Sequence, residues 1–259
     1  MAVITRHIAF GDLHGCLEEF KELLKRLEFN QTNDKLWICG DITDRGPQST
    51  ETVTFIQELY QKGCLLSVQG NHDNRHVRFW RHEKKRKLDT TYVNPMQGFI
   101  EDKEKMQVFN SLSESNLEFL ASLPYYIRIN ENWVIVHAGF MPSVPLKKQN
   151  KDVMTHVRHV SLAEKKCINL TADKKQPKDT CYWYEKWQGP ENVIFGHDAK
   201  RDIVIHESKP GVFCYGIDTG ICFGGKLTAF ILETKEFVQV VCIKKWTYDE
   251  GWESQLKSV

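Results

Sequence analysis

Five short apolar runs along this chain are each followed, within a few residues, by aspartate, asparagine or histidine. The runs are 7–10, 36–39, 65–68, 133–136 and 192–195, and their composition predicts buried strands. Strands of one sheet bring their carboxyl ends to one edge, where α/β sheets bind ligands. We therefore expect the polar side chains to converge there in a two-metal hydrolytic centre. The polar segments are Gly11-Asp12-Leu13-His14-Gly15, Gly40-Asp41-Ile42-Thr43-Asp44-Arg45-Gly46, Gly70-Asn71-His72-Asp73, Val136-His137-Ala138-Gly139 and Gly196-His197-Asp198.

The spacing of these residues predicts how two ions would be shared. Asp12 and His14 are two residues apart, so in an extended segment both side chains face the same way and can bind one ion. The carboxylate of Asp41 has two oxygens and could bridge two ions. Mixed oxygen and nitrogen ligands suit Mn²⁺, Fe, Zn²⁺ or Co²⁺ better than a calcium site. The second ion would take neutral ligands, from Asn71, His137 and His197.

Residues beside these ligands predict the remaining chemistry. Arg45 could grip phosphate oxygens with its planar fork. His72 directly follows the ligand Asn71, so its side chain should point away from the metal ligands and towards a substrate. Held by Asp44, His72 could protonate a leaving oxygen. Any one of the five motifs alone is more often a turn or a helix cap. Five in order, each at the end of a predicted strand, favour the catalytic interpretation.

With these motifs on residues 11–197, the chain resembles the metallophosphoesterase superfamily, within its phosphoprotein-phosphatase-like group. The resemblance implies a calcineurin-like α/β sandwich of two mixed β-sheets flanked by helices. It also implies that Asp12, His14 and Asp41 bind the first metal, and that the second is bound by Asp41, Asn71, His137 and His197. His72 and Asp44 would then form the acid pair, and Arg45 would bind phosphate.

Finer features distinguish two branches of that group. Eukaryotic protein Ser/Thr phosphatases carry Leu-Arg-Gly-Asn-His-Glu, where this chain has Gln69 before Gly70 and Asp73 after His72, and their later Ser-Ala-Pro-Asn-Tyr is absent. The segments 137–146, 189–199 and 217–220 are instead similar to ApaH-like phosphatases, relatives of diadenosine tetraphosphatase. That resemblance implies phosphoanhydride substrates, such as dinucleoside polyphosphates, inorganic polyphosphate or mRNA caps. Arg158 matches the second phosphate-binding arginine.

Two further clusters could select a substrate. Residues 75–87 are rich in arginine and lysine. This segment could attract a polyanion to the site, or it could simply form a solvated helix face. Arg75 and Arg78 are nearest the expected metals and are the better candidates for phosphate binding. Aromatic residues at 182–187 could stack a base, although packing beneath a loop is commoner. For Trp246, Tyr248 and Trp252, docking of the C-terminal tail is expected rather than recognition.

The rest of the pattern predicts one domain over residues 1–259. Helices are expected at 16–28, from Pro47 to Gly63, at 72–88 and at 97–123, and residues 141–180 are expected to form a long functional or mobile loop. Apolar runs within 212–243 predict a β-meander, followed by a tail at 244–259. A parallel first half and an antiparallel second half suggest two stacked sheets.

Composition excludes some classes of protein. Net charge is +1, so nothing global argues for nucleic acid or a membrane, and no apolar stretch approaches the ~20 residues of a membrane span. The start lacks the features of a signal peptide. Eight scattered cysteines without a CxxC pair indicate a reduced, cytoplasmic protein without a zinc ribbon. No obligate protein partner is implied.

The sequence thus favours a phosphohydrolase with two divalent ions, of which Mn²⁺ is the leading candidate. It would split phosphoanhydride bonds in a polyphosphate small molecule or capped RNA through attack by a metal-bound hydroxide. Three alternatives stay open. They are a protein Ser/Thr phosphatase, an inactive metal-loaded scaffold that binds polyanions, and a nucleic-acid-binding module.

Overall fold

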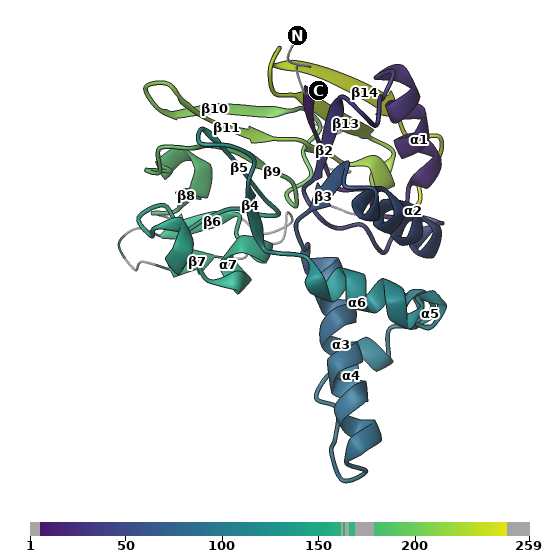
Figure 1. Ribbon diagram of the computed structural model, residues 1–259. Coiled ribbons are helices and arrows are strands. Elements are labelled where there is room, and N and C mark those ends of the chain that lie inside the picture. Colours follow the sequence, from purple (N-terminus) through teal and green to yellow (C-terminus); the bar gives the residue numbers. More distant parts are fainter. Residues whose placement is uncertain (1–5, 162, 164–165, 169–178, 248–259) are drawn as a thin grey trace.

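Two large mixed β-sheets pack face to face at the centre of the molecule, with helices outside them (Figure 1). The computed structural model describes residues 6–161, 163, 166–168 and 179–247. This is the sandwich that the sequence predicts. The expectation of a single domain over the whole chain stays a prediction. No helix among the described residues is both long and apolar enough to cross a bilayer.

The first sheet has the strand order β12-β13-β1-β2-β3, with β14 beside β13. The parallel strands are β1 (Arg6–Phe10), β2 (Asp34–Ile38) and β3 (Leu65–Ser67). β13 runs antiparallel to its three neighbours β1, β12 and β14. The remaining strands are β12 (Asp218–Thr219), β13 (Lys226–Ile231) and β14 (Glu236–Val241).

The second sheet has the order β10-β11-β9-β5-β4. Its centre is parallel, because β9 runs parallel to both β5 and β11, and its two edge strands are antiparallel to their neighbours. The bounds are β4 (Tyr126–Arg128), β5 (Trp133–Val136), β9 (Asn192–Phe195), β10 (Val204–Lys209) and β11 (Val212–Gly216).

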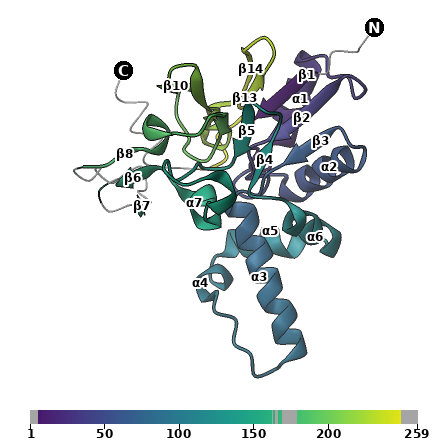
Figure 2. The ribbon, with the colours of Figure 1, turned by 60° about the vertical axis from the view of Figure 1, so that its left-hand side comes forward.

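Helices cover the outer face of the first sheet and continue below it. In α1, Leu17, Phe20 and Leu23 are buried on one face, while Glu18, Lys21 and Lys25 face solvent. α6 packs on α2 and α3, and the far half of α3 projects away from both sheets in the two views (Figures 1 and 2). The helices are α1 (Leu17–Arg26), α2 (Ser49–Gln61), α3 (Asn71–Leu88), α4 (Gln97–Ile100), α5 (Lys103–Ser111) and α6 (Glu114–Ser122).

The outer layer of the second sheet is built from shorter pieces. Trp183 and Trp187 are fully buried there and pack against Phe140. Around them lies a small sheet of order β7-β6-β8. The elements of this layer are η1 (Leu146–Lys148), α7 (Lys151–His156), β6 (His159–Ser161), β7 (Lys166–Ile168), β8 (Cys181–Tyr182) and η2 (Trp183–Lys186). A last 3-10 turn, η3 (Ile221–Phe223), follows β12.

All five predicted strands are confirmed, and their uninterrupted apolar character has a physical reason. Ala9 and Trp37 from the first sheet meet Ile135 and Ile194 from the second in one buried cluster. The opposite faces of the same strands are covered by the outer layers. Strands that are buried on both faces do not alternate between apolar and polar residues.

Two helical expectations need correction. The helix predicted at 97–123 is three helices, because Asp102 and Ser113 start new ones within it. The carboxylate of Asp102 accepts a hydrogen bond from the Lys105 amide, and the Ser113 hydroxyl accepts one from the Asn116 amide. In addition, α2 begins at Ser49 instead of Pro47.

The predicted loop at 141–180 and the predicted β-meander are also wrong in part. Residues 146–161 contain η1, α7 and β6, although 162, 164–165 and 169–178 lie outside the described residues. β11 belongs to the second sheet and pairs with β10, whereas β13 and β14 form a hairpin in the first. Local alternation reveals hairpins but not the sheet that each one joins. Most of the predicted tail, 248–259, lies outside the described residues.

Candidate metal centre

The predicted site residues meet where the carboxyl ends of strands from both sheets come together. The sequence predicts a site at the edge of one sheet, but the second sheet contributes two of the five segments. This position follows from the face-to-face packing of the sheets, which sets both strand edges side by side. Asp12 and His14 follow β1, Asp41 follows β2, Asn71 follows β3, His137 follows β5 and His197 follows β9.

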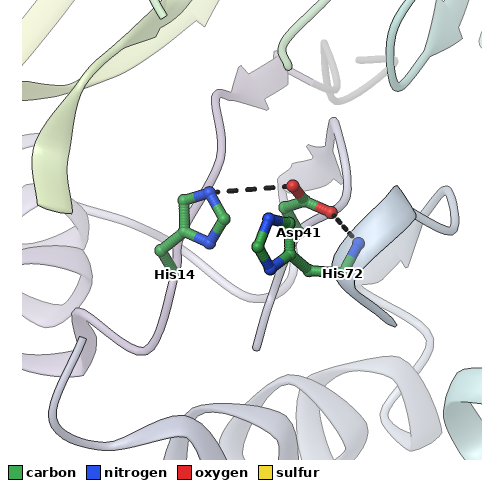
Figure 3. A group of neighbouring side chains, drawn as sticks. All are labelled: His14, Asp41 and His72. Carbon is green, nitrogen blue, oxygen red and sulfur yellow. Dashed lines mark hydrogen bonds and ion pairs between the residues drawn. The ribbon is translucent and has the colours of Figure 1, made fainter. Parts of the chain in front are cut away.

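Asp41 occupies the middle of this group. Its Oδ2 lies 3.7 Å from Nε2 of His14 and 3.5 Å from Nε2 of His137. Its Oδ1 accepts the backbone N–H of His72 at 2.9 Å, as Figure 3 shows. Candidate ligand atoms form two sets, and within each set they lie within 4.8 Å of one another. Asp41 belongs to both sets. The first also contains His14 and His72, and the second also contains His137 and His197. A carboxylate shared in this way has the position that a bridging ligand needs.

The histidines present the nitrogen that a metal requires. Nδ1 of His14 donates to the Thr43 carbonyl at 3.0 Å, and Nδ1 of His137 donates to the Cys39 carbonyl at 2.8 Å. A carbonyl can only accept, so both rings carry their proton on Nδ1 and have a lone pair on Nε2. Nε2 of His137 then faces Oδ1 of Asn71 at 3.0 Å, acceptor against acceptor. A cation held between two such acceptors would relieve their repulsion.

The electrostatics of the cluster also fit divalent cations. Burial raises the pKa of Asp12, which the nearby charges of Asp218 and Asp41 raise further. Burial likewise raises the pKa of Asp41 and of Asp218. The imidazoles are driven to the neutral form, because burial lowers the pKa of each, to about 3 for His137 and in the same direction for His14 and His197. Crowded carboxyls among neutral imidazoles form a donor set suited to two divalent ions.

The backbone of the site is held in an uncommon conformation. Five candidate site residues have a positive φ, between 44° at His14 and 69° at Asp44 and His197. Side chains other than glycine rarely adopt this region, and such strain collects at functional sites. Two glycines are required by close approach. A Cβ at Gly70 would lie 2.0 Å from Oδ1 of Asp41, and one at Gly196 would lie 2.0 Å from Oδ1 of Asp12.

Asp73, which the sequence analysis did not single out, fixes the loop after β2. Its Oδ1 accepts the backbone N–H groups of Ile42 and Thr43 and the Thr43 hydroxyl, and its Oδ2 accepts the N–H of Gly70. Asp73 is fully buried, so these bonds are shielded from water. They tie the loop that carries Asp41 to the start of α3. The signal was already in the motif, where Asp73 follows His72.

A second missed residue, His76, lies behind the proposed acid pair. Nδ1 of His72 is 2.7 Å from one oxygen of Asp44, and Nε2 of His76 is 2.6 Å from the other. Burial alone would raise the pKa of Asp44, but hydrogen bonds from both histidines outweigh it and hold that pKa well below its usual range. The ring of His76 is fully buried against Phe99 and Phe109. His76 is one helical turn beyond His72, and this spacing could have revealed it.

The three arginines predicted to bind phosphate have different settings. Arg45 is exposed beside the metal ligands, and its Nη1 donates to Nε2 of His14 at 3.1 Å. Arg158 lies on the other side of the cluster, where its Nε donates to Oδ1 of Asp198 at 2.9 Å. Arg75 is half-buried on α3. Burial lowers the pKa of His156, and the charges of Arg75 and Arg158 lower it further, which shows that these groups are neighbours.

Comparison with known proteins identifies the family. A model of the calcineurin-like phosphoesterases matches residues 5–216. This chain belongs to that family. The phosphoesterase resembles an asymmetrical bis(5′-nucleosyl)-tetraphosphatase PrpE of Oceanobacillus iheyensis, with 31% identity over 89% of this chain and 90% of the relative. A PrpE of the same description from Bacillus cereus is 29% identical over 89% and 92% of the two chains. Members of the family are metal-dependent hydrolases, so the chain is an enzyme of that class.

Solved structures agree with this assignment. A crystal structure of a proposed diadenosine tetraphosphatase superposes with a TM-score of 0.71 and 28% identity, and covers 93% of this chain and 95% of the other. A protein serine/threonine phosphatase from Saccharomyces cerevisiae superposes with a TM-score of 0.54 at 15% identity, over 96% and 82% of the two chains. The second likeness shows the fold alone.

The other candidate clusters in the phosphoesterase have structural settings. Trp183, Tyr184 and Trp187 of the aromatic cluster are buried in the outer layer of the second sheet, which is the packing alternative. On α3, Lys84 pairs with Glu114 and Arg86 pairs with Glu83. These basic residues are solvent-exposed on the half of the helix that projects from the body (Figure 1).

We expect the substitution His76→Phe to destabilise the phosphoesterase by about 1–3 kcal/mol, because one oxygen of the buried Asp44 carboxylate loses its donor. Phenylalanine keeps the ring packing against Phe99 and Phe109. The measurement is the free energy of unfolding in urea. His206→Phe is the matched control. Its ring is half-buried and has no hydrogen bond among the described residues, so its effect should stay within about 0.5 kcal/mol. Equal effects of the two substitutions would contradict the role given to His76.

Proposed function

We propose that this phosphoesterase hydrolyses phosphoanhydride bonds in dinucleoside polyphosphates, with inorganic polyphosphate and capped nucleotides as further candidates. The proposal is supported above all by the two groups of candidate ligand atoms that share Asp41, one of which contains His72, hydrogen-bonded to Asp44. The relatives named as bis(5′-nucleosyl)-tetraphosphatases over nearly their whole length support the substrate class.

Two divalent ions, with Mn²⁺ as the first candidate, complete the proposed site. Asp12, His14 and Asp41 would hold one ion. The other would be held by Asp41, Asn71, His137 and His197. When bound, such ions activate water as a nucleophile and stabilise the charge that develops on a phosphoryl group.

The side chains around the ions would bind the phosphate groups and supply a proton to the leaving oxygen. Arg45 would hold phosphate oxygens on one side of the ions, and Arg158 and Arg75 on the other. Nδ1 of His72 is engaged by Asp44, so Nε2 is the atom from which a proton can pass to the leaving oxygen. Burial lowers the pKa of His72, while the charge of Asp41 and the hydrogen bond to Asp44 oppose that shift and favour the protonated ring.

Gln69 favours an anhydride substrate over a phosphoprotein. It stands where the Ser/Thr phosphatases carry an arginine, and its amide is used within the fold. Its Nε2 donates to the Leu120 carbonyl and its Oε1 accepts from Asn74. The position therefore offers no cation to a phosphopeptide. An inactive scaffold is disfavoured because every expected ligand is present.

The proposal is tested by comparing kcat/KM of the Mn²⁺-loaded enzyme for four substrates, since this ratio measures discrimination. They are diadenosine tetraphosphate, inorganic tripolyphosphate, capped RNA and a phosphoserine peptide. We expect an anhydride to be preferred over the peptide by at least about tenfold, which corresponds to ~1.4 kcal/mol. A preference of that size for the peptide would instead support a protein phosphatase.

The proposed bridging role of Asp41 makes a separate prediction. Asp41→Asn should lose bound metal and activity together, and a chelator should abolish turnover of the wild type reversibly. Metal content is measured by elemental analysis beside the rate. Asp89→Asn, an exposed carboxylate at the end of α3, is the control and should change neither. Full activity in protein shown to be free of metal would exclude the mechanism.

His72 can be separated from the ligands by its dependence on the leaving group. His72→Asn should retain near-normal metal content, while kcat falls on the order of 10²–10⁴-fold for a dinucleoside polyphosphate. The loss should be smaller for p-nitrophenyl phosphate, whose leaving group needs little protonation. Asp44→Asn should behave alike, and the double mutant should lose less than the product of the two. Because His72 also lies near His14 and Asp41, loss of one metal in His72→Asn would identify it as a ligand instead.

A further inference from the structure

Two adjoining cavities open beside the proposed acid pair. The smaller, of about 190 Å³, is lined by Asp44 and His72, and the larger, of about 460 Å³, extends to Trp246. Their combined space is in the range of small-molecule sites. Because they share walls, the two cavities adjoin, and together they extend from His72 to the indole; we name them the Trp246 groove. The shared walls are Arg45, Glu104, Val108 and Thr247.

The charges along this groove indicate what each end can hold. Arg45 stands at the junction, next to the metal ligands. Glu104 lies on the wall shared with the smaller cavity, and Glu51 lines the larger cavity alone; both side chains are exposed and have no hydrogen bond or ion pair to another described residue. A phosphate chain in that cavity would be repelled by two carboxylates. A neutral group with hydroxyls and amines would instead find acceptors, so phosphates should stop at Arg45.

The far end of the groove offers an aromatic surface. Trp246 is half-buried and packs against the core, and its backbone N–H and that of Thr247 both donate to the Cys222 carbonyl, at 3.0 and 3.1 Å. The indole is therefore held in place. Trp246 lines the larger cavity, and the ammonium of the exposed Lys244 lies 5.4 Å from the ring centre. The exposed amide of Gln107, on the same wall, can pair with the edge of a base.

We propose that the Trp246 groove binds a nucleoside on the leaving-group side of the scissile phosphate. The base would stack on Trp246, and the ribose hydroxyls would donate to Glu51 or Glu104. This inference rests on the proposed phosphoanhydride activity and adds to it a reason for preferring nucleotides over inorganic polyphosphate. From the sequence alone, docking of the tail is favoured over recognition for Trp246.

The test compares two substrates that carry the same kind of bond. Diadenosine tetraphosphate has nucleosides at its ends, and inorganic tetraphosphate has none. Trp246→Ala should lower kcat/KM for the dinucleotide by about fivefold or more, the range expected for loss of one stacked base. Glu51→Gln should lower it by a similar factor, because the ribose hydroxyl loses a charged acceptor. Both should leave inorganic tetraphosphate within about twofold. Glu58→Gln is the matched control, because Glu58 is an exposed carboxylate on the same helix that does not line the groove.

Each outcome decides the inference. A selective loss on the dinucleotide in both variants supports it. Losses of equal size on both substrates, or no loss on either, overturn it while the wild type still cleaves anhydrides. An equal gain on both substrates in Glu51→Gln also overturns it, because the carboxylate would then act only by repelling charge. A wild type that cleaves neither anhydride overturns the proposed function, and the inference with it. Glu51→Gln keeps the test valid if Trp246→Ala fails to fold.

Discussion

The side chains of Asp12, Asp41 and Asp218 lie together out of water, between the edges of two sheets, and their mutual repulsion is what the surrounding structure must offset. Neutral imidazoles line the same space and cannot neutralise them. Hydrogen bonds to the backbone and close packing of the chain hold this unfavourable cluster in place. Asp73 binds three backbone amides around the loop of Asp41, and glycines let the chain pass within contact distance of the carboxylates. A centre built in this way is preorganised for cations before any arrive.

The two ends of the site also carry different groups. On one side, α3 supplies His72 and His76 around Asp44, with Arg45 and the Trp246 groove beyond them. On the other side, the group of Arg75, His156 and Arg158 lies beside His197. Under the proposed function, a linear polyphosphate would span the site, with one end protonated on departure and the other held by arginine. This asymmetry gives the two halves of a symmetric dinucleotide different surroundings.

The convergence of the candidate ligands was predictable from sequence because each lies soon after an apolar run, and strand ends in an α/β fold converge. The same reasoning could not assign strands to sheets. Val212–Gly216 and Lys226–Ile231 look alike as apolar strands, but the short β12 between them carries the chain from one sheet to the other. The hydrogen bond of His76 to Asp44 is not predicted from the sequence, because a lone histidine within a basic helix has no motif around it. The Trp246 groove is not predicted either, since α2, α5 and the C-terminal segment each provide only part of its wall.

The contact between the Asp12 carboxylate and the backbone of His197 joins residues 185 positions apart in the chain. The candidate ligands come from segments along nearly the whole of that span, and two of the six, His137 and His197, follow strands of the second sheet, which must first pack against the other. The set that includes His137 and His197 would therefore be complete only after residue 197 has emerged from the ribosome and the sandwich has closed. Metal loading would in that case be the last event of folding, and a nascent or truncated chain ending before β9 would carry a partial, weakly binding site.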